Sequence, residues 1–252
     1  MYPLAAPTGT PPNTHPATPG QAPSRRRVID DPMRMFHWLF ATAFAGAYLS
    51  ADSEHFRLLH VTLGNILAGL LAFRLVYGLF GPPQARLARL RGRLAGARGW
   101  LHGLRHGGAI DWRRGQNLLT ALAIASLLLL APLMLLSGYA VWQEWAPDLL
   151  AGIDEDWLEE LHEVIANAFL AIVLGHLALM AGLSLLRGSN QALPMLTGQV
   201  DGAGPSPVQK RRRGLAALLL LATLAYAAWA WQQAPHGLVP ALSALSSRIT
   251  FL

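Results

Sequence analysis

Hydrophobic residues in this chain fall into five long runs, separated by polar and basic segments. A helix needs about 20 mostly apolar residues to cross the hydrocarbon core of a bilayer. The three middle runs reach that length, and the first and last are at the short end. The pattern predicts an all-α integral membrane protein, with a four-helix transmembrane bundle and a fifth transmembrane helix. The predicted spans are Met35–Ala51, Leu58–Phe80, Leu118–Trp142, Leu161–Leu186 and Gly214–Trp231.

The composition also indicates a membrane protein. Of the 252 residues, 53% are hydrophobic and only 13% are charged, whereas a soluble domain has about 25% charged residues. The mean hydropathy is +0.33. The chain contains no cysteine, which excludes disulfides, thiolate zinc sites, cysteine-ligated iron–sulfur clusters and covalently attached haem. Histidine is therefore the leading ligand for any transition metal or haem.

The net charge of +6 follows the predicted topology. Lys and Arg concentrate in the N-terminal arm, residues 81–117 and residues 187–213, which fall on one side if all five helices span. Cytoplasmic loops are rich in Lys and Arg, so we expect a bacterial inner-membrane protein with a cytoplasmic N-terminus and a periplasmic C-terminus. The acidic segment 143–158 lies on the other side and is a candidate for steering a basic partner. Because the charge follows topology, nucleic-acid binding is not favoured.

The chain divides into three predicted regions. Residues 1–27 form a disordered cytoplasmic arm, since residues 1–24 are rich in Pro and Thr and have no apolar period. Residues 28–198 form the four-helix membrane domain. Residues 199–252 contain a linker, the fifth helix and an extracytoplasmic tail. The fifth helix is interpreted either as a peripheral helix or as a docking element for a partner subunit.

A signal peptide is the alternative interpretation of the N-terminus. Arg25–Arg27 and the apolar run after them resemble one, with a tolerable cleavage site at Ala51. Asp30, Asp31 and His37 fit a signal peptide poorly, so a retained first helix is favoured.

Four of the nine histidines lie inside predicted helices, where an ionisable side chain indicates function. His162 and His176 are 14 residues apart on the fourth helix, which is about 21 Å of rise and close to four whole turns. They therefore share one face at two depths. His60, near the outer start of the second helix, matches the depth of His162. His37, near the cytoplasmic start of the first helix, matches the depth of His176. The pattern predicts two bis-histidine sites stacked across the bilayer.

Haem b explains these two sites best. Its iron needs only two axial imidazoles, because the macrocycle fills the other four positions. Zinc would need a third or fourth protein ligand, and no helix offers one at either depth. A hydrogen-bonded core histidine would explain one of the four residues, but four at matched depths are hard to explain that way. The sequence therefore predicts two haem b groups held by His37, His60, His162 and His176.

Three arginines are candidate partners of haem propionates. Arg34 lies one helical turn before His37, and Arg57 lies near the outer pair. Snorkelling to the membrane interface explains these two arginines equally well. Arg74 lies 14 residues after His60, on the same face at the cytoplasmic depth. Its deeper position favours the propionate role.

Five short segments of the chain match the motifs of a known family in order and spacing. They are Val28–Trp38, His60–Gly64, Phe73–Gly78, Glu160–Asn167 and Pro194–Gly198. Through them the chain resembles the bacterial cytochrome b561 and nickel-hydrogenase cytochrome b family over about residues 27–198. The resemblance implies a four-helix diheme cytochrome that passes electrons between a quinone pool and a partner redox protein, with the four histidines as axial ligands. Many relatives have a Gly-His-Asn-Pro-like motif before the third helix, where this chain has Arg113–Asn117.

The predicted function is electron transfer across the membrane. Two axial histidines leave no open position on the iron, which disfavours oxygen chemistry there. Electrons would pass between quinone or quinol and a partner such as a c-type cytochrome or a membrane oxidoreductase subunit. A partner with covalent haem must be a separate chain, because this one has no cysteine. An electron-transfer subunit is favoured over a stand-alone enzyme.

Two other functions stay open. The first is a superoxide:quinone oxidoreductase, an activity of some relatives, which would need a basic pocket at the outer haem. Only Arg57 and His55 supply basic groups on that side before the tail. The second is a haem-free transporter or assembly factor whose membrane histidines move protons, which predicts no haem spectrum.

The remaining polar features are given structural interpretations. His102 and His106 have the spacing of a helical metal site, but residues 81–117 are predicted to be a basic loop that faces anionic membrane lipid. Asn65 and Asn167 are predicted to bond between helices rather than to contact haem.

Overall fold

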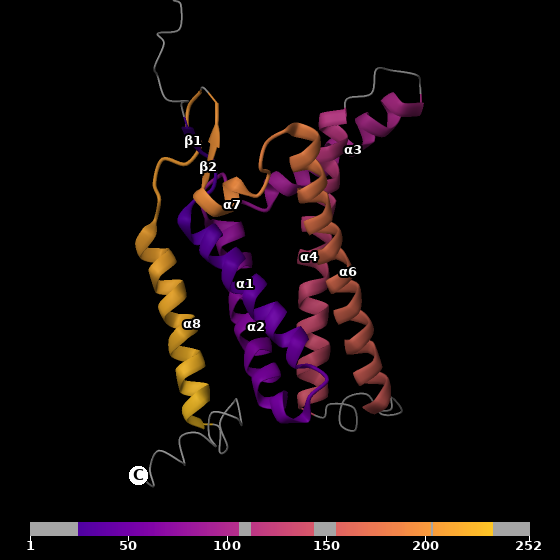
Figure 1. Ribbon diagram of the computed structural model, residues 1–252, viewed down its shortest axis with the longest axis vertical. Helices are drawn as coiled ribbons and strands as arrows, with labels where there is room; N and C mark the ends of the chain where they lie inside the picture. Colours follow the sequence, from indigo (N-terminus) through magenta and orange to yellow (C-terminus); the bar gives the residue numbers. More distant parts are fainter. Residues whose placement is uncertain (1–24, 106–111, 144–154, 203, 234–252) are drawn as a thin grey trace, which may run out of the picture.

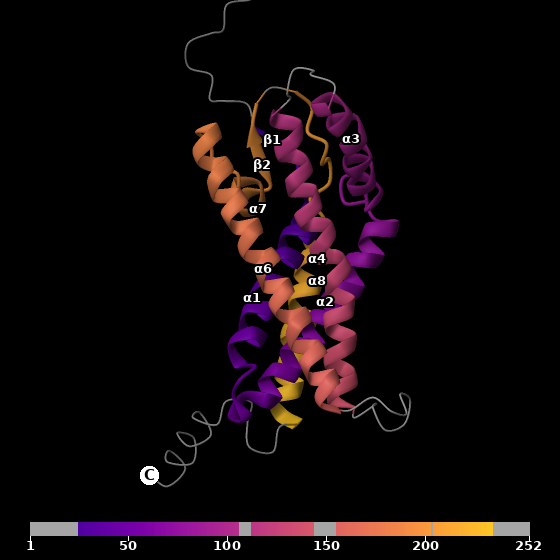
Figure 2. The ribbon, with the colours of Figure 1, turned by 90° about the vertical axis from the view of Figure 1, so that its right-hand side faces the viewer.

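The computed structural model describes residues 25–105, 112–143, 155–202 and 204–233. Long helices in this part of the chain run along one common axis (Figure 1). After a turn of 90°, α3 is seen beside the upper part of α4 (Figure 2). The helices are α1 (Asp31–Ser50), η1 (Glu54–Phe56), α2 (Arg57–Phe80), α3 (Ala88–Arg105), α4 (Trp112–Trp142), α6 (Glu155–Arg187), α7 (Leu193–Thr197) and α8 (Arg213–Gln233), and the strands are β1 (Arg25–Arg27) and β2 (Gln199–Asp201).

Four helices in the described part are long and apolar enough to cross a membrane, judged by length and composition. Helix α1 is not among them, because Asp31, Arg34 and His37 make its first two turns more polar. It nevertheless runs beside α2 within the bundle (Figure 1). The all-α architecture and its apolar helices confirm the predicted membrane fold. The four candidate spans are Glu54–Phe80, Arg114–Trp142, Asp156–Arg187 and Arg213–Gln233.

Helix α1 starts before the predicted Met35 because a polar residue caps it. The Asp30 side chain accepts a hydrogen bond from the Met33 backbone N–H at 3.3 Å. Pro32 lies in the first turn, where its missing N–H costs no helical bond. The hydrophobic run marks the apolar part of the helix, whereas the cap determines where the helix begins.

Two predicted segments are corrected by the structure. Arg25–Arg27, assigned to the disordered arm, forms β1 and pairs antiparallel with β2, with Arg25 opposite Asp201. Residues 81–117, predicted to be a basic loop, contain the helix α3, which packs against α4. His102 lies on α3, and His106 lies outside the described residues, as does most of the acidic segment.

The hydrophobic core lies where α1, α2, α4 and α6 meet. Helix α1 packs most extensively on α2, and α4 on α6, so the bundle consists of two helical hairpins. Phe169 of α6 is 2% exposed, and its ring centre lies 4.7 Å from that of Phe44 on α1. The buried core residues are Ala43, Phe44, Ala47, Ile66, Leu67, Leu70, Leu71, Ala131, Met134 and Phe169.

Helix α8, the predicted fifth helix, packs on α1 and α2 (Figure 1). Leu219, Tyr226 and Ala227 on α8 pack against the core of the bundle. The face of α8 that carries these three residues is therefore covered by α1 and α2 of the same chain.

Candidate functional site

His60 on α2 and His162 on α6 face each other as the outer pair. Their ring centres are 6.2 Å apart, and the rings are nearly perpendicular, at 88°. Two imidazoles that bind one metal from opposite sides, each through a bond of about 2 Å, have ring centres roughly 6 Å apart. The separation therefore fits a single iron between the two rings.

The Nδ1 atom of each outer histidine is held by the protein. His60 Nδ1 lies 2.8 Å from the Ala47 carbonyl oxygen. Because a carbonyl oxygen only accepts, Nδ1 carries the hydrogen and donates it. His162 Nδ1 lies 3.0 Å from Ser137 Oγ, and the Ser137 hydroxyl donates to the Met134 carbonyl at 3.0 Å. Ser137 therefore accepts from His162. Histidines that bind metals usually have their second nitrogen held in this way, which leaves Nε2 of both rings for the iron.

Helix α4 approaches His162 closely because residue 138 is glycine. A Cβ atom at Gly138 would lie 2.8 Å from Cε1 of His162. The missing side chain makes room for the imidazole between α4 and α6. Sequence reasoning missed this residue, because it considered small residues on the ligand helices and Gly138 lies on another helix.

His37 on α1 and His176 on α6 are the predicted inner pair. Their Nδ1 atoms are buried and have no hydrogen-bond partner within the described part of the chain. Buried polar atoms are normally satisfied in folded proteins. Unlike the outer pair, the inner pair therefore has no protein group that holds Nδ1 within the described part of the chain, and its assignment rests on depth.

A layer of packed aromatic rings lies between the two pairs. Phe169 is seven residues from each of the two α6 histidines, which is about 10 Å along the helix axis. Its ring packs against Phe44 at 4.7 Å and Phe40 at 6.4 Å between ring centres. The two histidine pairs therefore lie at different depths, with a dry layer between them.

The histidine pairs fit haem better than a metal ion held by side chains alone. Among the described residues, no three His, Asp or Glu side chains are grouped to hold a metal ion. Haem brings four equatorial nitrogens and needs only the two axial ligands that each pair offers.

All three arginines predicted to bind propionates make contacts within the protein, beginning with Arg57 and Arg74. The Arg57 guanidinium carbon lies 5.7 Å from the centre of the Trp142 ring, a cation–π contact between α2 and α4. Arg74 is 9% exposed, and its Nη1 donates to the Ala85 carbonyl at 3.3 Å.

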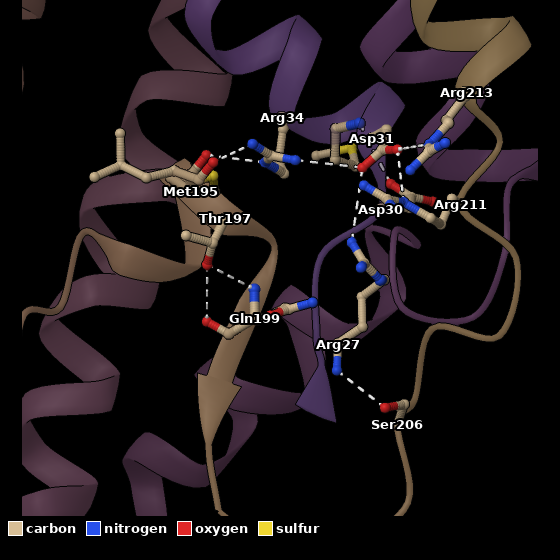
Figure 3. A network of polar contacts seen from close by, with 12 residues as sticks. Arg27, Asp30, Asp31, Arg34, Met195, Thr197, Gln199, Ser206, Arg211 and Arg213 are labelled. Carbon is tan, nitrogen blue, oxygen red and sulfur yellow. Dashed lines mark hydrogen bonds and ion pairs between the residues drawn. The ribbon is translucent and has the colours of Figure 1, made fainter. Parts of the chain in front are cut away.

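Arg34 joins α1 to α7. Its Nε donates to the Met195 carbonyl at 3.2 Å, Nη2 donates to the Leu196 carbonyl, and Nη1 lies 3.3 Å from Asp31 Oδ1 (Figure 3). For all three arginines, a propionate contact stays a prediction.

Asn167 bonds between helices, which confirms that prediction. The Tyr48 hydroxyl on α1 donates to Asn167 Oδ1 at 2.8 Å, and Asn167 Nδ2 lies 3.4 Å from Glu163 Oε1. These contacts tie α1 to α6 close to the outer pair.

An ionic cluster at the start of α1 was missed by sequence reasoning. Asp30 is fully buried and accepts a hydrogen bond of 2.6 Å from the Tyr77 hydroxyl. Arg212 Nη1 lies 3.8 Å from the same carboxylate. The neighbouring Asp31 has four arginines within 4 Å of its carboxylate (Figure 3). They are Arg27, Arg34, Arg211 and Arg213.

Removing the Ser137 hydroxyl should weaken haem binding at the outer pair. In Ser137→Ala, His162 Nδ1 loses its partner, and loss of such a contact typically lowers affinity about 10- to 100-fold. The rate of haem transfer to apomyoglobin measures the effect. Thr223→Ala is the control, since this hydroxyl bonds to the Leu219 carbonyl of its own helix and to no other group that the structure describes. Equal haem loss from both variants would contradict a role for Ser137 at the outer pair.

Comparison with protein families identifies the chain. A family model described as prokaryotic cytochrome b561 matches residues 28–198. No curated protein and no solved structure matches the chain at a significant level. The matched range contains both histidine pairs and ends before α8. Because the match covers more than half of the chain, this protein belongs to the prokaryotic cytochrome b561 family.

Proposed function

We propose that this protein holds two haem b groups and carries electrons across the bilayer between quinone and an extracytoplasmic redox partner. Family membership establishes a multi-pass membrane b-type cytochrome that binds haem and transfers electrons. The number of haems, their ligands and the partners are the proposal.

The geometry of the outer pair is the observation that carries the proposal. The rings of His60 and His162 have the spacing that one iron requires, and both Nδ1 atoms are held by the protein. We assign the outer haem to this pair and the inner haem to His37 and His176, because His176 lies on the same face of α6 as His162, 14 residues further along.

When bound, haem b supplies a one-electron redox couple at each site. Ala47 and Ser137 hold the two outer imidazoles, which would bind the haem iron, in one tautomer and orientation. Phe169 and the apolar residues around it keep water out of the layer between the sites. If two histidines held each haem, its iron would have no open position, and substrates would exchange electrons with the haem edge rather than bind to iron.

The distribution of basic segments supports an orientation. The strand β1, the helix α3 and the arginine-rich start of α8 lie at one end of the bundle, and η1 lies at the other (Figure 1). Cytoplasmic segments are enriched in Lys and Arg. We therefore place the basic end, with the inner pair nearer to it, in the cytoplasm of a bacterial cell, and the end of α8 outside the inner membrane.

Electron exchange with quinol tests the proposal. The full-length haem-loaded protein is reconstituted in liposomes, reduced with decylubiquinol, and followed by its haem absorbance before and after a c-type cytochrome is added outside. We expect reduction by quinol and reoxidation by the cytochrome, or the reverse sequence from reduced cytochrome to quinone. His60→Ala should slow exchange with the outside at least about tenfold, because one of the two sites on the path is lost.

The control is His55→Ala, which removes an exposed histidine on η1, five residues before His60. It should leave the rate unchanged. A protein that dithionite reduces but that exchanges electrons with neither quinone nor cytochrome would contradict the proposed partners. Reduction of quinone by superoxide with the purified protein alone would favour the superoxide:quinone oxidoreductase instead.

A further inference from the structure

The ionic cluster at the start of α1 extends to the start of α8 and has more positive than negative charge. Five arginines lie within 4 Å of a carboxylate, at 3.2 to 3.9 Å, but only Asp30 and Asp31 supply negative charge in these pairs. The arginines come from β1, α1 and the segment entering α8, so the cluster joins three parts of the chain (Figure 3). They are Arg27, Arg34, Arg211, Arg212 and Arg213.

The start of α8 adds to the positive potential of this cluster. A helix N-terminus carries a partial positive charge of about half a unit. Arg213 is the first residue of α8, and Arg211 and Arg212 directly precede it. Arginines at this end of a helix are repelled by its dipole, so an anion bound among them would be stabilised by both the side chains and the helix.

The backbone at Arg212 is strained in a way that gathers these side chains. Its φ angle is 54°, in the left-handed region that residues with a side chain rarely adopt. Arg212 contacts Asp30 and the Tyr77 hydroxyl, the latter at 3.3 Å, while the residues on both sides of it reach Asp31. Strain of this kind often accompanies ligand-binding sites.

Two guanidinium groups at the start of α8 are accessible to an anion. The side chains of Arg211 and Arg213 are 42% and 69% exposed, and each meets Asp31 through its Nε atom. A guanidinium whose Nη groups are accessible binds a phosphate through two parallel hydrogen bonds.

The depth of the cluster selects the kind of anion. Arg213 is also where the apolar span of α8 begins, so the arginines lie at the level of lipid phosphates. Below them, α8 exposes Leu218 and Leu221, which give acyl chains an apolar surface. We propose that this cluster binds the phosphate of an anionic phospholipid, which then links α8 to the start of α1.

Native mass spectrometry of the full-length haem-loaded protein tests this site. The protein in detergent is titrated with phosphatidylglycerol, with phosphatidylcholine and, separately, with inorganic phosphate. We expect the anionic lipid to bind in preference to phosphatidylcholine. Arg211→Gln/Arg213→Gln should weaken binding of phosphatidylglycerol roughly 30-fold, since each basic group near an anionic lipid contributes about fivefold.

The matched control is Arg89→Gln/Arg91→Gln, which removes the same charge from two exposed residues of α3. It should change the affinity less than about threefold. If the double variant at α8 does not fold, Arg213→Gln alone should give the fivefold loss. Equal losses from the α3 and α8 variants, equal binding of both lipids, or displacement of the lipid by inorganic phosphate at similar concentration would overturn the proposal.

Discussion

His162→Ala is expected to leave one haem b per chain where the unaltered protein has two. The substitution removes one axial ligand of the outer pair, and His60 alone offers a single imidazole to the iron. The inner pair should keep its haem, because the aromatic layer around Phe169 separates the two sites. A redox titration of the haem absorbance should then show one transition instead of two.

The same measurement on other variants tests which histidines belong together. His60→Ala should lose the same transition as His162→Ala, whereas His37→Ala and His176→Ala should lose the other one. His55→Ala should retain both haems. An intact His162→Ala protein with two haems would show that His162 is not a ligand, and loss of both haems from a folded variant would contradict independent sites.

Asp30→Ala should destabilise the protein more than any other single change in the ionic cluster. Asp30 is fully buried, caps α1, and receives hydrogen bonds from Tyr77 and the Met33 backbone. The substitution removes the cap of α1, which costs about 1 kcal/mol. It also leaves the Tyr77 hydroxyl without its acceptor, which costs about 1–3 kcal/mol more. For a chain of this size, we expect the Tm in detergent to fall by roughly 4–16 °C.

Two further variants separate the causes of this loss. Asp30→Asn keeps a side chain that caps the helix and accepts from Tyr77, so its loss should be smaller than that of alanine. Asp201→Ala breaks the ion pair with Arg25. The side chains of Asp201 and Arg25 are 57% and 60% exposed, so the loss should cost less than about 1 kcal/mol. If Asp30→Ala were no less stable than Asp201→Ala, the buried cluster would not hold the end of the bundle together.

The histidine pairing stays a prediction, and it rests on membrane helices being nearly straight and regular. Fourteen residues place His162 and His176 on one face, and depth alone matches each of them with a histidine on another helix. The geometry of His60 and His162 agrees with that reasoning. The hydrophobic runs likewise predicted the long helices, because apolar length is the main requirement for crossing a bilayer.

Contacts between residues distant in the chain could not be predicted in this way. Asp31 and Arg211 are 180 residues apart, and β1 pairs with a strand that follows α7. Sequence reasoning used Asp30 and Asp31 only to argue against a signal peptide, because their partners were unknown. The propionate roles of Arg34 and Arg57 rested on depth, which does not reveal that α7 and Trp142 offer these side chains other partners.

The ratio of haem b to protein tests the two-site assignment most directly. A pyridine haemochrome assay on the purified full-length chain, expressed with sufficient haem, gives this ratio without any assumption about partners. Two haems per chain are expected if both histidine pairs bind iron. One haem per chain would contradict one of the two pairs, and the absence of haem would contradict both.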